Sequence, residues 1–273
     1  MEMAKKMFGL GILIAIIMLS GCQTAQNITI MSYNIHHGQG TDGKLDLDRI
    51  ASIIEKSQAG LVILNEVDNN YSGRSNNEDQ GQVLADKLRM NHVFGPGIIT
   101  GDPAKPNLYG NAILSKFPIK SSKTHKLPGP GEPRCCLEAE IELPGGILTV
   151  FATHLEHSKS EARSKQANEI MRLVEKCKTP LIVAGDMNAT PTSETIAVYL
   201  QKLFDTEQLA NSKVSSITIK DNRAAKIDYI FVSTDLVKNV KSYNVIDNDV
   251  TAVASDHFPI KSIVKIPSSK KAN

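Results

Sequence analysis

This sequence has no large excess of positive or negative charge. Its 31 Lys and Arg residues face 29 Asp and Glu residues, so the formal net charge is only +2. Proteins that hold nucleic acid on a broad basic face carry a larger positive balance, so no such face is predicted, although a local basic patch stays open. Tryptophan is absent, and the sequence contains no apolar aromatic hairpin of the kind that inserts into a bilayer.

Cysteine is scarce, with four residues in 273. Cys135, Cys136 and Cys177 lie in the body of the chain, and none belongs to a C-x-x-C pair of the kind that binds zinc. The adjacent Cys135 and Cys136 would form only a strained bridge with each other. One disulfide to Cys177 stays open, but small buried thiols are the interpretation that we favour.

The N-terminus has the pattern of an export signal. Lys5 and Lys6 precede an apolar run over residues 7–19, close to the roughly 7–15 residues of a secretory signal. The following Leu19-Ser20-Gly21-Cys22 resembles the bacterial lipobox, in which the cysteine is acylated. We therefore predict a lipoprotein signal peptide over residues 1–21, a tether over residues 22–27, and a protein exported to the cell envelope and lipid-anchored to a bacterial membrane. A buried helix or a short membrane anchor is the alternative.

The rest of the chain contains no linker that would divide it. We predict one domain over residues 28–267 and a disordered tail over residues 268–273. Short apolar runs rich in β-branched residues predict strands over residues 28–33, 61–64, 112–114, 147–151, 181–184, 227–232 and 258–264. Apolar residues at helical spacing predict helices over residues 46–54, 82–88 and 161–177. Many strands with a few helices fit layered sheets with helices outside.

Several of these strands end in polar, titratable residues. They end in the sequences Tyr33-Asn34, Asn65-Glu66, Thr153-His154, Gly185-Asp186-Met187-Asn188, Ile227-Asp228 and Ser255-Asp256-His257. Carboxylate and amide oxygens suit Mg²⁺, Mn²⁺ or Ca²⁺, and histidines exchange protons near neutral pH. Each motif alone has a simpler explanation, such as an Asx-turn or a core histidine, but their presence in one chain favours a shared site.

Seven motifs in order resemble the endonuclease/exonuclease/phosphatase superfamily, the fold of deoxyribonuclease I. They are Met31-Ser32-Tyr33-Asn34-Ile35, Asn65-Glu66-Val67, Tyr109-Gly110-Asn111-Ala112-Ile113-Leu114-Ser115, Thr153-His154-Leu155, Gly185-Asp186-Met187-Asn188, Ile227-Asp228-Tyr229-Ile230 and Ser255-Asp256-His257. The resemblance runs from about residue 28 to residue 266. It implies an α/β (α+β) fold, a four-layer α/β/β/α sandwich with the site at one end of the paired sheets.

The resemblance also implies roles for the matching residues. Metal-binding positions fall on Asn34, Glu66 and Asp256, with Glu66 the principal ligand. Catalytic positions fall on His154, Asp186, Asn188, Asp228 and His257. Among these, His257 resembles the general base and His154 the phosphate-contacting histidine or general acid. Asp186 and Asn188 resemble the residues that orient water and phosphate, and in some members the counterpart of Asp186 transfers a proton.

Three further residues are candidates for binding substrate. Arg134 is the last residue of a Pro- and Gly-rich loop over residues 126–134, Arg74 lies in the polar stretch after Glu66, and Asn111 follows Gly110. A solvated Arg is the alternative for Arg134, and a tight turn is the alternative for Asn111.

The resemblance implies a hydrolase of phosphoester bonds that depends on Mg²⁺, with Mn²⁺ or Ca²⁺ as alternatives, and that forms no covalent intermediate. The near-zero charge places a small-molecule or lipid head-group phosphoester ahead of nucleic acid as substrate. A nuclease acting on DNA or RNA is one alternative, and a non-catalytic ligand-binding protein of the same fold is another. We expect a monomer.

Overall fold

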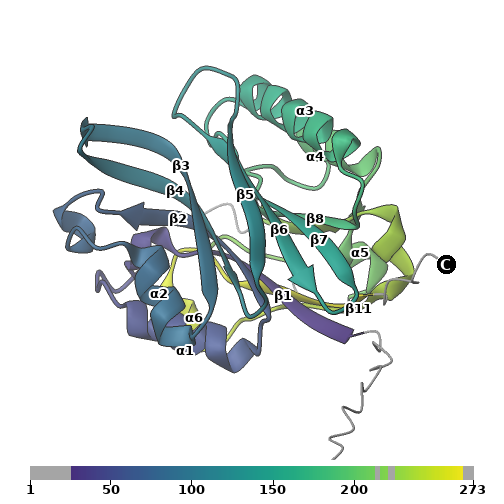
Figure 1. The fold of residues 1–273 in the computed structure, drawn as a ribbon, viewed down its shortest axis with the longest axis horizontal. Coiled ribbons are helices and arrows are strands. Elements are labelled where there is room, and N and C mark those ends of the chain that lie inside the picture. The colour runs from purple at the N-terminus through teal and green to yellow at the C-terminus, as the bar shows by residue number, and fades with distance from the viewer. Residues whose placement is uncertain (1–25, 213–215, 221–224, 267–273) are drawn as a thin grey trace, which may run out of the picture.

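The computed structural model describes residues 26–212, 216–220 and 225–266. Two six-stranded mixed sheets pack face to face, with helices on the outer side of each (Figure 1). The architecture is the predicted α/β sandwich of the deoxyribonuclease I type. The predicted signal peptide, most of the tether and the predicted tail lie outside the described residues.

The first sheet has the order β11-β12-β1-β2-β4-β3. Its strands are β1 (Gln26–Asn34), β2 (Leu61–Asn69), β3 (Asn91–Asp102), β4 (Lys105–Ser115), β11 (Val240–Val245) and β12 (Ile260–Ile266). β1 starts two residues earlier than predicted, because Gln26 and Asn27 pair with Ile266 and Lys265 instead of belonging to the tether.

The second sheet has the order β5-β6-β7-β8-β10-β9. Its strands are β5 (Ile119–Lys126), β6 (Cys135–Leu143), β7 (Gly146–His154), β8 (Leu181–Asp186), β9 (Phe204–Asp205) and β10 (Asp228–Val232). Because side chains alternate along a strand, each sheet presents one apolar face to the other sheet and one to helices. In β1, for example, Ile30 belongs to the core between the sheets and Met31 to the core under the helices.

The helices divide between the two outer faces (Figure 1). α1 (Leu47–Ser57) and α2 (Gln80–Leu88) cover the first sheet, where the short α6 (Thr251–Ala254) contacts α1. α3 (Ser160–Lys176) and α4 (Glu194–Leu200) cover the second sheet, and α5 (Thr206–Leu209) contacts β10 and β11. Three 3-10 turns complete the described elements: η1 (His36–Gly38), η2 (Gly73–Ser75) and η3 (Thr234–Asn239).

The sequence-based prediction missed β3, the edge strand β5 and all of β4 except the predicted strand over residues 112–114. Residues 91–102 contain glycines and Pro96, and β5 is largely polar, so neither has the apolar pattern of a core strand. The three cysteines of the described chain are free thiols, as we favoured, with Cys135 and Cys136 buried. Within the described ranges, no helix is long and apolar enough to cross a membrane.

Candidate active site

The polar strand ends meet at one end of the two sheets. β1 runs parallel to β2, and β7 runs parallel to β8, so each pair delivers its carboxyl ends to the same edge. In the second sheet His154 lies opposite Asp186, and Asp186 lies opposite Asp228, the first residue of the antiparallel β10. The sheet registers therefore place His154, Asp186 and Asp228 side by side.

A bulge in β2 brings Glu66 to this edge. The pairing between β2 and β4 changes register between Leu64 and Val67, and Glu66 adopts a left-handed φ of 57°. A bulge re-aims side chains that a regular strand would place on alternate faces. The sequence contains no glycine or proline here that would have predicted this irregularity.

Asn65 in the same bulge connects the two sheets. Its Nδ2 donates to the carbonyl of Thr153 on β7 (2.9 Å) and to Oδ1 of Asn111 on β4 (2.8 Å), while its Oδ1 accepts from the amide of Asp186 (2.9 Å). The side chain is fully buried, so these bonds satisfy groups that have no access to water. Asn65 is therefore a positioning residue that the sequence-based prediction omitted from its site.

Close contact between β7 and β8 requires glycine at position 185. Its φ is 139°, and a Cβ there would lie 1.9 Å from the carbonyl oxygen of Thr153. The following Asp186 is thus fixed against β7, with its Oδ1 accepting from the amide of Asn188 (2.8 Å). This is the Asx-turn that the Gly185-Asp186-Met187-Asn188 pattern predicted.

Side chains from distant parts of the chain surround the Oδ2 atom of Asp186. Nδ2 of Asn34 donates to it at 3.2 Å, Nε2 of His154 lies 3.4 Å away, and Nε2 of His257 lies 3.7 Å away. Asn188 closes the group by donating from Nδ2 to Nε2 of His154 (3.0 Å) and to the carbonyl of Leu155 (3.0 Å). Four of the predicted metal-binding and catalytic residues therefore meet around the carboxylate of a fifth, Asp186.

His257 has a carboxylate partner of its own. Its Nδ1 lies 2.9 Å from Oδ2 of Asp228, and both residues are buried. Because a carboxylate accepts, Nδ1 carries a hydrogen and the ring is held with Nε2 toward Asp186. This pair connects the segment before β12 to β10, and so brings Asp228 into the site as predicted.

Burial and neighbouring charges separate the pKa values of the two histidines. Burial alone would lower the pKa of His257, but the Asp228 carboxylate, aided by Asp186 and Asp256, outweighs it and raises the pKa to about 10. Burial lowers the pKa of His154 well below its ordinary value, and the positive charge of Arg134 adds to that effect. Burial and the nearby Asp228 raise the pKa of Asp186 to about 7. In the free protein at neutral pH, His257 is therefore charged and His154 neutral.

These pKa shifts affect the roles that were predicted for the two histidines. A general base has to be unprotonated, and the Asp228 partner keeps the proton on His257 in the free protein. A phosphate-donating His154 has to be protonated, which requires the negative charge of a bound phosphate to raise its pKa. The assignments of base to His257 and acid to His154 stay predictions, and Asp186 is the group whose pKa lies near neutrality.

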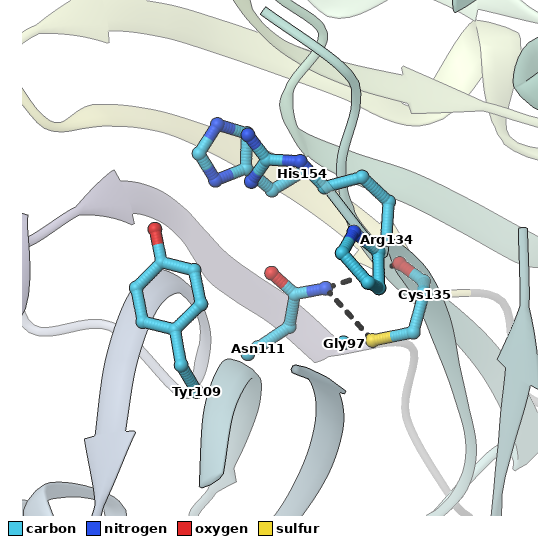
Figure 2. A pocket seen from close by; sticks show the side chains of 8 residues that line it. Gly97, Tyr109, Asn111, Arg134, Cys135 and His154 are labelled. Carbon is cyan, nitrogen blue, oxygen red and sulfur yellow. Dashed lines mark hydrogen bonds between the residues drawn. The ribbon is translucent and has the colours of Figure 1, made fainter. Parts of the chain in front are cut away.

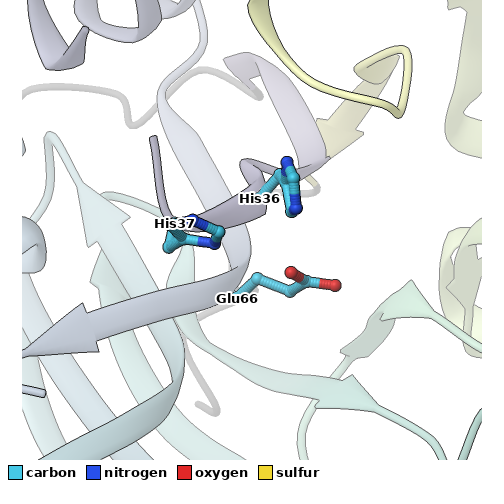
Figure 3. A group of neighbouring side chains, drawn as sticks. All are labelled: His36, His37 and Glu66. Carbon is cyan, nitrogen blue, oxygen red and sulfur yellow. The ribbon is translucent and has the colours of Figure 1, made fainter. Parts of the chain in front are cut away.

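Two groups of side chains have metal-ligating atoms within 4.8 Å of one another in the described chain. One is Asp186, Asp228 and His257, and the other is His36, His37 and Glu66. Both donor sets fit a divalent cation, although in the first His257 and Asp228 are hydrogen-bonded to each other. In the second group, Glu66 was predicted as the principal metal ligand, whereas His36 and His37 were not predicted as site residues (Figure 3). Its signal in the sequence was a pair of adjacent histidines just after the strand-end Asn34.

Two predicted metal ligands have other contacts in this arrangement. Asn34 donates from Nδ2 to Oε1 of Glu66 (2.9 Å), and its Oδ1 accepts from the amide of His36 (3.0 Å), so its oxygen is engaged by the backbone. Asp256 belongs to neither donor group among the described residues, and its Oδ1 accepts from Oγ of Ser255 (3.3 Å). Metal ligation by Asn34 and Asp256 stays a prediction, and the structure brings only Asn34 next to Glu66.

Arg134 lies beside His154 in a hollow that Tyr109 and Asn111 also line (Figure 2). The Arg134 side chain is buried, with Nη1 3.1 Å from Oε1 of Glu132 and with no hydrogen-bond partner for Nε within the described ranges. Its position fits the predicted contact with substrate. Asn111, in contrast, donates to the carbonyl and Sγ of Cys135, so its amide supports the site and is not free to reach a ligand.

The guanidinium of Arg74 is already paired with a carboxylate, so it is not free to bind substrate. Its guanidinium donates to both oxygens of the buried Asp68 (2.9 and 2.7 Å) and stacks over the rings of Tyr71 and Tyr109. The Asp68 carboxylate neutralises its charge locally. The predicted contact between Arg74 and substrate therefore requires this pair to separate.

Comparisons with known proteins agree with the fold and the motifs. Residues 31–257 match the profile described as the Endonuclease/Exonuclease/phosphatase family. Protein cwh43 of Schizosaccharomyces pombe is 36% identical over 109 residues, which are 39% of this chain but only 11% of that protein. The chain thus spans a small part of the length of this curated relative.

Solved structures share the fold at low sequence identity. An endonuclease/exonuclease/phosphatase from Beutenbergia cavernae has a TM-score of 0.77 at 24% identity, over 90% of this chain and 73% of that one. A mannosyl-6-phosphatase from Bacteroides thetaiotaomicron has a TM-score of 0.70 at 19% identity, over 87% and 99%. The human Nocturnin catalytic domain, with a bound sulfate anion, has a TM-score of 0.68 at 22% identity, over 88% and 93%. With its profile match over most of its length, this chain belongs to the endonuclease/exonuclease/phosphatase family.

Proposed function

We propose that this chain is a divalent-metal-dependent phosphoesterase of the cell envelope, with a small-molecule or lipid head-group phosphoester as its substrate. The observation that carries the proposal is the convergence on Oδ2 of Asp186. Two imidazoles and the amide of Asn34 surround this atom, and Asn34 joins it to Glu66. An anion of phosphate size beside Asp186 would contact groups of both sheets.

The protonation state of each side chain determines its proposed role in hydrolysis. His257, held charged by Asp228, presents Nε2–H as a donor to a phosphate oxygen. Asp186, with a pKa of about 7, is partly ionised at neutral pH and accepts a proton from water at Oδ2. Asn188 orients His154, whose Nε2 faces the same space, and Arg134 adds positive charge at its rim. A divalent ion at Glu66 would supply Lewis acidity for the developing charge.

Hydrolysis of bis(p-nitrophenyl) phosphate tests this proposal. The soluble form beginning after Cys22 should turn over with Mg²⁺ or Mn²⁺ and stop with EDTA. His257→Ala and Glu66→Gln should each lose about 10²–10⁴-fold in kcat/KM, as expected for an acid–base group or a metal ligand. Two matched controls should keep wild-type rates. They are His92→Ala, on β3 away from the site, and Glu55→Gln, at an exposed position of α1. Equal rates in all five proteins would contradict the assignment.

A substrate panel distinguishes the classes of phosphoester. We expect turnover of small or lipid-linked phosphodiesters to exceed that of DNA and RNA, in keeping with the near-zero net charge. A reversed order would identify a nuclease. Failure on every phosphomonoester, phosphodiester and nucleic acid would favour a non-catalytic binding protein.

The envelope location rests on the N-terminal sequence. The lipobox-like Leu19-Ser20-Gly21-Cys22 predicts acylation of Cys22. Labelling with radioactive palmitate should mark the full-length protein in the membrane fraction, and Cys22→Ser should abolish the label. Labelling that persists in the variant would contradict the predicted anchor.

A further inference from the structure

We propose that His36 and His37 act with Glu66 to bind a first-row transition-metal ion, in the class of Mn²⁺, Fe²⁺ and Zn²⁺, in preference to Mg²⁺. The ligand atoms of these three residues lie within 4.8 Å of one another. Figure 3 shows both rings beside the Glu66 side chain, which comes from β2. The inference deepens the proposed function by naming its metal, and only its catalytic consequence rests on that function.

Gln39 fixes which nitrogen each ring offers to an ion. Nδ1 of His36 lies 3.1 Å from the Gln39 carbonyl oxygen, which can only accept, so Nδ1 carries the hydrogen and Nε2 has the lone pair. Nε2 of His37 lies 3.3 Å from Oε1 of Gln39, whose Nε2 donates to the carbonyl of Gly43 (3.2 Å). Nε2 of His37 is therefore the donor, and Nδ1 has the lone pair. Metal-bound histidines are typically held by such an outer hydrogen bond.

The backbone of the η1 turn is held in an unfavourable conformation. His36 and His37 have φ values of 46° and 43°, and left-handed geometry costs about 1–2 kcal/mol for each such residue. Buried Gln80 at the start of α2 holds the turn by donating to the carbonyl of His37 (2.6 Å), while its own carbonyl accepts from the amide of Asp68 (3.0 Å). The surrounding structure thus imposes the geometry that places two adjacent rings beside one carboxylate.

The donor set indicates the class of metal. Mg²⁺ prefers oxygen ligands and keeps several waters, whereas imidazole nitrogens suit Fe²⁺ and Zn²⁺; Mn²⁺ also favours oxygen but accepts imidazole more readily than Mg²⁺ does. The oxygen of Asn34 accepts from the His36 amide, so within the group of His36, His37 and Glu66 the two imidazoles supply the nitrogen lone pairs beside the carboxylate.

Manganese binding to the chelator-treated protein tests the inference directly. Free Mn²⁺ is measured by electron paramagnetic resonance, and pulsed measurements detect ¹⁴N nuclei bound to the ion. We expect bound Mn²⁺ to show imidazole ¹⁴N couplings and to resist displacement by an equal concentration of Mg²⁺.

The variants His36→Gly and His37→Gly remove each donor while keeping the left-handed backbone accessible. Each should weaken Mn²⁺ binding at least about tenfold and reduce the ¹⁴N signal, with His92→Ala as the matched control. Gln39→Leu, which removes only the side-chain acceptor, should weaken binding less. Circular dichroism shows whether each variant is folded.

Two results would overturn the inference. One is bound Mn²⁺ without ¹⁴N couplings. The other is wild-type affinity in both histidine variants while Glu66→Gln abolishes binding, which would assign the ion to oxygen ligands alone. Failure of the proposed function is seen separately, as metal binding with ¹⁴N couplings but no turnover on the substrate panel.

Discussion

Replacing Asp228 by Asn should change the protonation of His257 with little change in shape. Nδ1 of His257 lies 2.9 Å from Oδ2 of Asp228 in a buried pair, and this carboxylate is the main cause that raises the pKa to about 10. The difference between about 10 and the ordinary value of 6.5 corresponds to about 5 kcal/mol in favour of the charged imidazole. Asp186 and Asp256 remain in Asp228→Asn, so part of this stabilisation is kept. Because burial opposes the charge, the pKa should still fall below about 8.

The effect can be followed by nuclear magnetic resonance titration of His257 in the EDTA-treated protein. In the wild type the ring should stay protonated through pH 9. Its contribution to stability is fully present below pH 6.5 and is lost as the pH rises through about 10, because the folded pKa is the higher one. In Asp228→Asn the ring should titrate below about pH 8, and kcat/KM should fall about 10²–10⁴-fold. A ring that stays protonated at pH 9 in the variant, or activity within threefold of wild type, would refute the reasoning.

Three further predictions concern the frame of the site. Asn65→Ala leaves three buried partners unsatisfied, so urea unfolding should show a loss of about 3–5 kcal/mol, and a loss below 1 kcal/mol would contradict its bridging role. Gly185→Ala should prevent stable folding, because its Cβ would overlap the Thr153 carbonyl, whereas Gly43→Ala, also at positive φ but in open space, should still fold in thermal melts. Burial would raise the pKa of Glu156, but hydrogen bonds outweigh it and lower the pKa to about 2. The ionised Glu156 therefore stabilises the fold above pH 4.5, and this contribution is lost as the pH falls through about 2. In Glu156→Gln the free energy of unfolding should depend less on pH in this acidic range.

Much of the site followed from the sequence because its residues stand directly after apolar strands. His154, Asp186 and Asp228 end or begin core strands, and parallel or antiparallel pairing brings such positions to one edge. The four-layer arrangement was implied by the resemblance of the seven ordered motifs to the endonuclease/exonuclease/phosphatase superfamily, and the two packed sheets confirm it. The structure adds that His154 and His257 both approach Oδ2 of Asp186, and that Asp228 joins the group through its contact with Nδ1 of His257.

The missed features depend on irregular backbone or on distant partners. The backbone is left-handed at His36, His37 and Glu66, none of which is a glycine, so the residue types did not predict this conformation. The bridging role of Asn65 depends on β4, β7 and β8 packing against it, which no local pattern encodes. The same holds for Arg74, whose pairing with Asp68 is a property of the fold.

The position of β12 in the first sheet has a consequence for the order in which the protein is built. β12 is the last strand in chain order, yet it lies between β11 and β1 in the interior of the sheet. On the ribosome, β1 is made before β12 and waits for this antiparallel partner, which lies more than two hundred residues further along the chain, so the sheet closes only after β12 has been synthesised. His257 enters the site three residues before β12 begins. His257 therefore cannot take its place in the site of a nascent chain until β12 has docked, and shortening the chain within β12 should remove the core of the sheet together with activity.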